Sequence, residues 1–169
     1  MNVMREIKIE KVTVNIGVGT PGDKLENAKT LLENITSKTP VETLARDRNP
    51  VFKLRKGLPI GAKVTLRGED AKSFLEKALT AKKKVLKSQN FDRNGNFAFG
   101  VAEYIDFPGA RYDPTIGMVG FDVCVTLKRP GKRIQIRRIR RSRLGKKHRI
   151  TKEEAIEFAK NVLGSRIEE

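Results

Sequence analysis

The chain has 169 residues with 36 Lys and Arg against 20 Asp and Glu, so its formal net charge is +16. A single cysteine excludes an internal disulfide and a cysteine-based metal cluster, and no apolar run approaches the roughly 18 residues of a membrane-spanning helix. The amino terminus is charged and lacks the apolar segment of a signal peptide, which predicts a cytoplasmic protein with no membrane partner.

The first predicted strand and helix fall within residues 11–37. Residues 11–16 alternate between an apolar and a polar face, which is typical of a half-buried strand. The apolar face carries Val12, Val14 and Ile16, and the polar face carries Lys11, Thr13 and Asn15. Apolar residues then recur at helical spacing over 23–37, which predicts an amphipathic helix packed on this strand.

A second strand of the same design follows. A short strand is expected at 41–44, and the charged, turn-rich segment 46–51 predicts an exposed loop. In the clear strand 62–67, apolar residues alternate with a polar face made of Lys63, Thr65 and Arg67. Residues 69–87 predict a second amphipathic helix, with Val85 and Leu86 among its inward-facing side chains.

The next segment reads as antiparallel strands. Asn94-Gly95 is a strong turn signal of the kind that joins such strands. Phe97 and Phe99 share one face of the following strand, where packing in the core is favoured over stacking on RNA bases. A loop rich in Gly and Pro, 107–117, leads to another alternating strand at 121–127.

The stretch 128–149 holds twelve Lys and Arg and no Asp or Glu, which leaves 24 Lys and Arg against 20 acids in the rest of the chain. Because burying a cation without an anion is costly, these side chains are expected to face solvent or a polyanion such as RNA. The alternative is a solvated, disordered tail. Ile134, Ile136 and Ile139 interrupt the charge, and a capping box at Thr151 and Glu154 starts a helix ending near Gly164, which argues against a tail.

These patterns predict an α+β fold, in which an antiparallel sheet has amphipathic helices packed on one face. A basic extended arm and a C-terminal helix complete it. We therefore expect an RNA-binding α+β domain at 1–127, the basic arm at 128–150 and a C-terminal helix at 151–169 that packs on the same domain.

Enzymatic chemistry has little support. Residues 17–22 read GVGTPG and match a dinucleotide-binding turn, with Glu42 roughly placed as the ribose acid, which leaves a nucleotide-dependent enzyme as one alternative. Pro21 lacks an amide donor that the pyrophosphate would need. His148 lies in the basic stretch and Cys124 in a strand, neither with a catalytic partner, so we expect no catalytic residue, metal or cofactor.

The two polar strand faces have an ordinary explanation as solvated sheet surface, and a functional one as RNA contacts. Short donors such as Asn and Thr on a rigid strand suit base or 2′-hydroxyl contacts, whereas Lys and Arg suit phosphates. A second alternative is an RNA chaperone that binds through the arm alone.

Four blocks of the sequence, at residues 10–19, 53–68, 90–123 and 145–155, occur in an order that carries a family resemblance. They resemble the large-subunit ribosomal protein called number five in bacteria and archaea and number eleven in eukaryotes. The block GKKHRITKEEA, with the arm before it, is similar to the archaeal and eukaryotic branch.

The resemblance implies a structural protein of the ribosome that binds 5S rRNA in the central protuberance and contacts 23S-type rRNA. It also implies contacts with P-site tRNA, with a neighbouring 5S-binding ribosomal protein, and with a small-subunit head protein across the subunit interface. The family's 5S-binding residues correspond to Lys11, Asn15 and Thr65. A fourth family position, commonly Gln, is Lys38 here, which replaces a bidentate amide by a point charge.

The tRNA-approaching loop of the family corresponds to 46–51, with Arg46 and Arg48 as phosphate contacts and Asn49 beside them. The arm is expected to enter adjacent rRNA. Its RNA-binding residues are expected to be Arg137, Arg138, Arg140, Arg141, Arg143, Lys146, Lys147 and Arg149.

Overall fold

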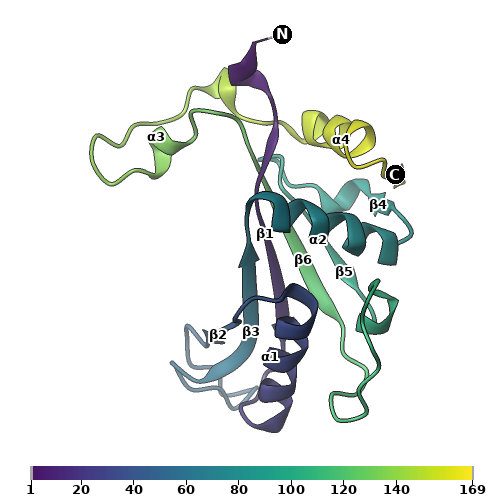
Figure 1. Ribbon diagram of the computed structural model, residues 1–169. Coiled ribbons are helices and arrows are strands. Elements are labelled where there is room, and N and C mark those ends of the chain that lie inside the picture. Colours follow the sequence, from purple (N-terminus) through teal and green to yellow (C-terminus); the bar gives the residue numbers. More distant parts are fainter. Residues whose placement is uncertain (1, 169) are drawn as a thin grey trace. The chain divides into compact units, whose positions relative to one another are not determined.

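The structure is a computed structural model that describes residues 2–168 (Figure 1). Within these residues, five strands form one antiparallel sheet, in the order β2-β3-β1-β6-β5. The strands are β1 (Lys8–Gly17), β2 (Val41–Leu44), β3 (Pro59–Leu66), β5 (Phe97–Val101) and β6 (Phe121–Lys128). The predicted α+β class with an antiparallel sheet is confirmed.

Four α-helices in the described chain accompany the sheet, and a small second sheet pairs β4 (Val85–Lys87) with β7 (Arg166–Glu168) in parallel. The helices are α1 (Asp23–Thr36), α2 (Gly68–Ala81), α3 (Arg133–Ile136) and α4 (Lys152–Asn161). Short 3-10 turns occupy Val3–Arg5, Ser88–Asn90, Tyr104–Asp106 and Lys146–His148.

The chain divides into two compact units, and each is described by itself. Unit 1 contains the chain up to Val12, then Arg67–Ala98, and the part from Val125 onward. Unit 2 contains Thr13–Leu66 and Phe99–Cys124. The predicted division into 1–127, 128–150 and 151–169 stays a prediction.

The core of unit 2 joins the apolar faces of its strands to α1. In β3, Ala62, Val64 and Leu66 are buried while the alternate side chains are exposed, and α1 packs on this strand. Leu25, Ala28, Leu31 and Leu32 form the buried stripe of α1. Each fully buried leucine contributes about 2 kcal/mol to stability. The opposite face of the sheet is polar, as is common in antiparallel sheets.

Close backbone packing fixes the strands of unit 2. A Cβ at Gly61 would lie 2.5 Å from the Ile16 carbonyl oxygen and 2.8 Å from the Thr43 Oγ1, so only glycine fits there. Beyond β5, the buried Tyr104 accepts a hydrogen bond from the Asp113 N–H at its hydroxyl, at 2.9 Å, which holds the long loop before β6.

Unit 1 has a core of its own. Along α2 the buried side chains are Ala71, Phe74, Leu75, Ala78 and Leu79. Phe97 is buried against Phe91, with ring centroids 5.2 Å apart, and Phe99, in unit 2, is also buried, so the core assignment of both predicted phenylalanines is confirmed. The capping box at Thr151 and Glu154 is present at the start of α4.

The prediction of one helix across 69–87 is wrong beyond residue 81. Lys83 and Lys84 adopt the left-handed conformation, with φ of 56° and 57°, which ends the helix. Val85 and Leu86 then form β4, whose partner β7 lies at the far end of the described chain. A pairing over such a distance leaves no local pattern, so β7 was also missed.

Candidate nucleic-acid interface

The open face of the sheet presents the predicted polar side chains of unit 2. Thr13 and Asn15 on β1 are half-buried, and Lys63 and Thr65 on β3 are exposed. Their alternate neighbours are buried, so strand alternation holds the polar groups rigidly outward. The predicted geometry of these four residues is confirmed, while their role in RNA binding stays a prediction.

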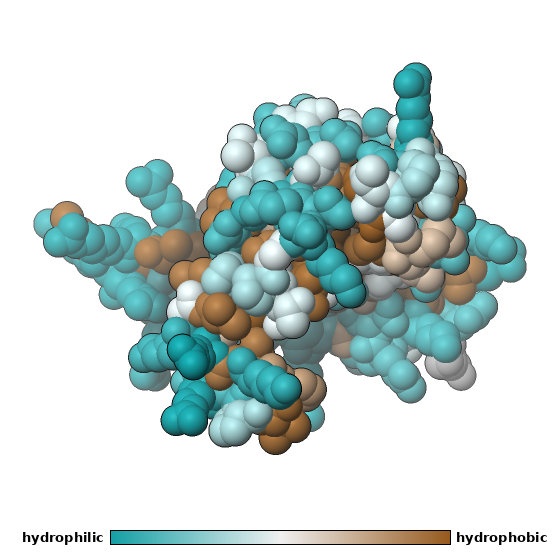
Figure 2. All heavy atoms as spheres, turned by 90° about the horizontal axis from the view of Figure 1, so that it is seen from below, coloured by the Kyte–Doolittle hydropathy of each residue, from teal (hydrophilic) through white to brown (hydrophobic). Residues whose placement is uncertain are grey.

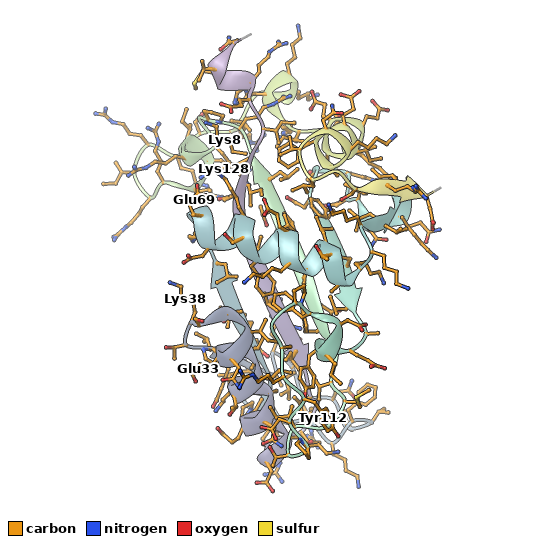
Figure 3. The ribbon with its side chains drawn as sticks, turned by 45° about the vertical axis from the view of Figure 1, so that its right-hand side comes forward. Lys8, Glu33, Lys38, Glu69, Tyr112 and Lys128 are labelled. Atoms are coloured by element: carbon orange, nitrogen blue, oxygen red, sulfur yellow. The ribbon has the colours of Figure 1, made fainter. Side chains whose placement is uncertain are left out.

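Three further candidates flank these positions. Lys11 is half-buried on the unit 1 portion of β1, and Arg67, which is exposed, is the N-cap residue of α2. Lys38 is exposed just beyond the end of α1 (Figure 3), where Ser37 turns the chain with a φ of 54°. Lys38 therefore leaves the helix in a loop, with a long side chain that suits a phosphate better than a base edge.

The loop 46–51 is exposed at Arg46 and Arg48, as predicted, but Asn49 has a structural role. Its Oδ1 accepts a hydrogen bond from the Val51 N–H at 3.0 Å, and its backbone exchanges hydrogen bonds with Leu54. Asn49 therefore shapes the loop. The tip also carries two apolar side chains that were not among the predicted contacts, Val51 at 84% exposure and Phe52 at 70%.

The arm displays its cations to solvent, and all eight predicted RNA-binding residues between 137 and 149 are exposed. The loop is not fully extended, because α3 forms one short helical segment in it. Arg137 Nε donates to the Arg140 carbonyl and Arg141 Nε to the Gln135 carbonyl, both at 2.8 Å. These contacts fold the tip back on itself.

One arginine of the basic stretch is buried, which corrects the prediction that all twelve cations face solvent or a polyanion. Arg129 is only 8% exposed, and its guanidinium makes three hydrogen bonds. Its Nε donates to the Arg5 carbonyl at 3.1 Å, its Nη1 to the Arg149 carbonyl at 3.3 Å, and its Nη2 to Glu154 Oε1 at 2.7 Å. The partner anion, Glu154, lies in α4, outside the basic stretch itself.

Two more contacts close the root of the arm. Lys132 Nζ lies 2.5 Å from Glu10 Oε2 on β1, and His148 Nε2 donates to the Pro130 carbonyl at 2.8 Å. Figure 3 shows Lys128 and Lys8 at the same end of the sheet, where the arm leaves β6. The two ends of the arm are therefore fixed at its root, while its tip remains accessible.

Glu154 is the anion on which this root depends. Burial acts to raise the pKa of its carboxyl, but hydrogen bonds from the Thr151 N–H and from Arg129 outweigh burial, and the pKa is lowered overall. Glu154 is thus ionised at neutral pH, serving both as a partner of Arg129 and as the reciprocal half of the capping box.

Two amide groups of the turn at 17–22 are already engaged in the fold and are not available to a pyrophosphate. The N–H groups of Val18 and Gly19 both donate to the Ile60 carbonyl, at 2.9 and 2.8 Å. Glu42, the candidate ribose acid, pairs with Lys29 at 2.5 Å, and β2 lies antiparallel to β3 rather than in a parallel βαβ unit. Among residues 2–168, no cluster of His, Cys, Asp or Glu is placed to hold a metal ion.

A shallow hollow on the open face of unit 2 was not anticipated. Asn15, Gly100 and Asp122 line it, and Asp122 is exposed on β6. Cys124 follows two residues later on the same face, where partial burial and the Asp122 carboxylate raise the pKa of the thiol. The raised pKa keeps the Cys124 thiol protonated at neutral pH.

The face of the molecule seen in Figure 2 suits a polar partner. On the face seen in Figure 2, hydrophilic side chains predominate, and hydrophobic ones occur in separate small areas. No helix in the described part of the chain is long and apolar enough to cross a bilayer.

Comparison with known proteins supplies the family. The family described as "Ribosomal protein L5" matches residues 2–55, and the model for the C-terminus of the same ribosomal family matches residues 59–158. The chain is similar to "Large ribosomal subunit protein uL5" of Methanococcus vannielii, with 50% identity over 97% of this chain and 92% of the relative. The protein of the same name from Methanococcus maripaludis strain C6 is 53% identical over 92% of this chain and 87% of its own.

The similarity extends beyond the genus Methanococcus. The uL5 protein of Sulfurisphaera tokodaii is 50% identical over 95% of this chain and 91% of its own length. The two family matches cover residues 2–55 and 59–158, which include parts of both units. The chain belongs to the uL5 family of large-subunit ribosomal proteins and is a structural, non-enzymatic constituent of the ribosome.

Proposed function

We propose that this protein binds 5S rRNA through the open face of its sheet and anchors in adjacent 23S-type rRNA through its basic arm. One observation carries the proposal: short polar donors lie on rigid strands at Thr13, Asn15 and Thr65, whereas eight exposed cations are clustered in the separate basic arm, between residues 137 and 149. Rigid donors suit selective contacts with bases and 2′-hydroxyls, and clustered cations suit phosphates. Phosphate contacts around the sheet face come from the cations Lys11, Lys38, Lys63 and Arg67.

The arm is proposed to provide attraction, with little sequence selectivity. Each phosphate that it neutralises releases condensed counterions, so its contribution weakens with salt. Arg129 and Lys132 fix the root of the arm before RNA binds. Less conformational entropy of the arm is therefore lost on binding.

The experiment measures 5S rRNA affinity at several salt concentrations for two sets of variants. Replacing Asn15 and Thr65 together by Ala should weaken binding by about 10-fold or more while leaving the salt dependence unchanged. Replacing Arg137, Arg138 and Arg140 by Gln should make the salt dependence shallower. The negative slope of log affinity against log salt should decrease in magnitude by about 2.

The matched control is Thr30→Ala with Asn34→Ala, which removes the same two residue types from the exposed side of α1. Its affinity should equal that of the unaltered protein. Equal changes of slope for the sheet and arm variants would refute the division of labour, and binding that survives the sheet variant but disappears with the arm would favour a non-selective RNA chaperone.

The loop 46–51 is proposed to approach the elbow of P-site tRNA, with Arg46 and Arg48 on its phosphates. Replacing both by Gln should speed the dissociation of peptidyl-tRNA from the P site of reconstituted ribosomes without affecting 5S binding. Unchanged dissociation would remove this part of the proposal. The contacts with a neighbouring 5S-binding protein and with a small-subunit head protein belong to the same proposal and rest on the family resemblance.

A further inference from the structure

The hollow on the open face of unit 2 has a volume of about 480 Å³ and combines glycines with two polar side chains. Its walls come from the end of β1, the end of β5 and the start of β6. The glycines are Gly17, Gly100 and Gly120, and the polar side chains are those of Asn15 and Asp122.

Two of its glycines have no evident structural reason. Gly17 has no atom within 4 Å of an added Cβ, and an added Cβ at Gly100 would meet only Asp122 Oδ1, at 3.3 Å. Neither adopts a positive φ, so both positions accept a side chain on conformational grounds. Gly120 differs, because its Cβ would lie 2.6 Å from the Ala102 carbonyl oxygen. The effect of Gly17 and Gly100 is to leave flat backbone uncovered beside Asp122.

The negative charge of Asp122 is unexpected on a surface that is proposed to bind RNA. In unit 2, it is the one acidic side chain on the open faces of β1, β3, β5 and β6 among the described residues. No Lys or Arg of the described chain forms an ion pair with it, and Cys124 beside it is a neutral thiol. A solvated carboxylate would repel phosphates and weaken RNA binding. A carboxylate that accepts hydrogen bonds from a base would instead strengthen it.

The base that fits a carboxylate best is guanine. Its Watson–Crick edge carries N1–H and N2–H side by side, so both carboxylate oxygens can accept at once, whereas adenine and cytosine offer only one exocyclic amine. In a paired helix this edge is occupied, so the ligand must be unpaired, the state in which proteins read RNA bases. Asn15, which lines the same hollow from β1, adds an amide donor.

We propose that this hollow binds an unpaired guanine base of RNA, with Asp122 accepting from its N1–H and N2–H and the bare backbone at Gly17 and Gly100 receiving the ring. The inference rests on the proposed binding of 5S rRNA, and it adds a base-specific site to that surface. Asp122 thereby becomes a determinant of specificity on a face otherwise made of neutral and cationic groups.

The test uses 5S rRNA in which inosine replaces guanosine at random positions, since inosine keeps N1–H but lacks the N2 amine. With the unaltered protein, bound RNA should be depleted of inosine at one unpaired position, by about 10-fold. With Asp122→Ala that depletion should vanish while depletion elsewhere persists, and overall affinity should fall by a similar factor. The matched control, Asp106→Ala, makes the same substitution at an exposed site in unit 2 and should keep the original pattern.

The results separate the two proposals. If the unaltered protein fails to bind 5S rRNA, the proposed function itself is refuted. If it binds, and Asp122→Ala leaves the inosine pattern unchanged or raises the affinity, the guanine site is refuted and Asp122 is a solvated carboxylate. Thermal unfolding of each variant checks folding, and because Asp122 is exposed, its removal should leave the unfolding temperature unchanged.

Discussion

Replacing Arg129 by Ala tests whether a buried arginine holds the root of the arm. The substitution removes three hydrogen bonds, to the Arg5 carbonyl, the Arg149 carbonyl and the Glu154 carboxylate. At about 1 kcal/mol for each bond, the free energy of unfolding should fall by about 3 kcal/mol. The Glu154 side chain is 37% exposed and rehydrates once its partner is gone, so the loss stays below that of a fully buried, stranded charge.

The assay is urea unfolding followed by circular dichroism, with the free energy extrapolated to zero denaturant. Arg129→Lys keeps the charge but offers a point donor in place of a planar fork, so it should recover about 1 of the roughly 3 kcal/mol. Arg133→Ala, at an exposed position in α3, is the control and should change stability by less than about 0.5 kcal/mol. If Arg129→Ala matched this control, the three hydrogen bonds would contribute nothing, and the account of the root would be wrong.

Three further predictions concern stability. The pKa of Glu154 is lowered in the folded protein, so ionised Glu154 contributes to the free energy of unfolding above the ordinary pKa of 4.5. This contribution is lost as the pH falls through the folded pKa. The unaltered protein should therefore lose more stability between about pH 5 and pH 3 than Glu154→Gln. Gly61→Ala should cost about 1–3 kcal/mol, since its Cβ would meet the Ile16 carbonyl, whereas Gly17→Ala should be neutral in the same denaturation assay. Thr151→Ala should cost about 1 kcal/mol in thermal unfolding through loss of the cap, and an unchanged unfolding temperature would show that the hydroxyl is dispensable.

Local patterns in the sequence sufficed for the main sheet and for helices α1, α4 and α2 up to residue 81. Alternation at Val12 and Val64 reports directly which face of a strand is buried, and the capping box at Thr151 is a short-range motif. The error at 82–87 arose where two left-handed lysines interrupt an apparent helical period. Helical spacing continues through Val85 and Leu86 by coincidence, and their partner strand lies far away in sequence.

The candidate site divides in the same way. The polar residues at Asn15 and Thr65 follow from strand alternation, and the exposed cations of the arm follow from the cost of burying charge. The burial of Arg129 could not be predicted, because it depends on an anion in α4 and on two carbonyl groups that only the folded chain brings together. Asp122 was overlooked for a related reason: its interest comes from the glycines around it, most of which lie in other segments of the chain.

The division into two units has a consequence for synthesis. All of unit 2 precedes Val125, whereas the core of unit 1 needs residues on both sides of it, including those in the stretch that carries the arm and α4. A chain emerging from N- to C-terminus therefore has the complete sequence of unit 2 while unit 1 still lacks its third portion, an interval of roughly a few seconds at typical rates of translation. During that interval unit 1, to which α2 belongs, lacks the residues from Val125 onward. The strongly basic arm is synthesised in the same segment of the chain that completes unit 1.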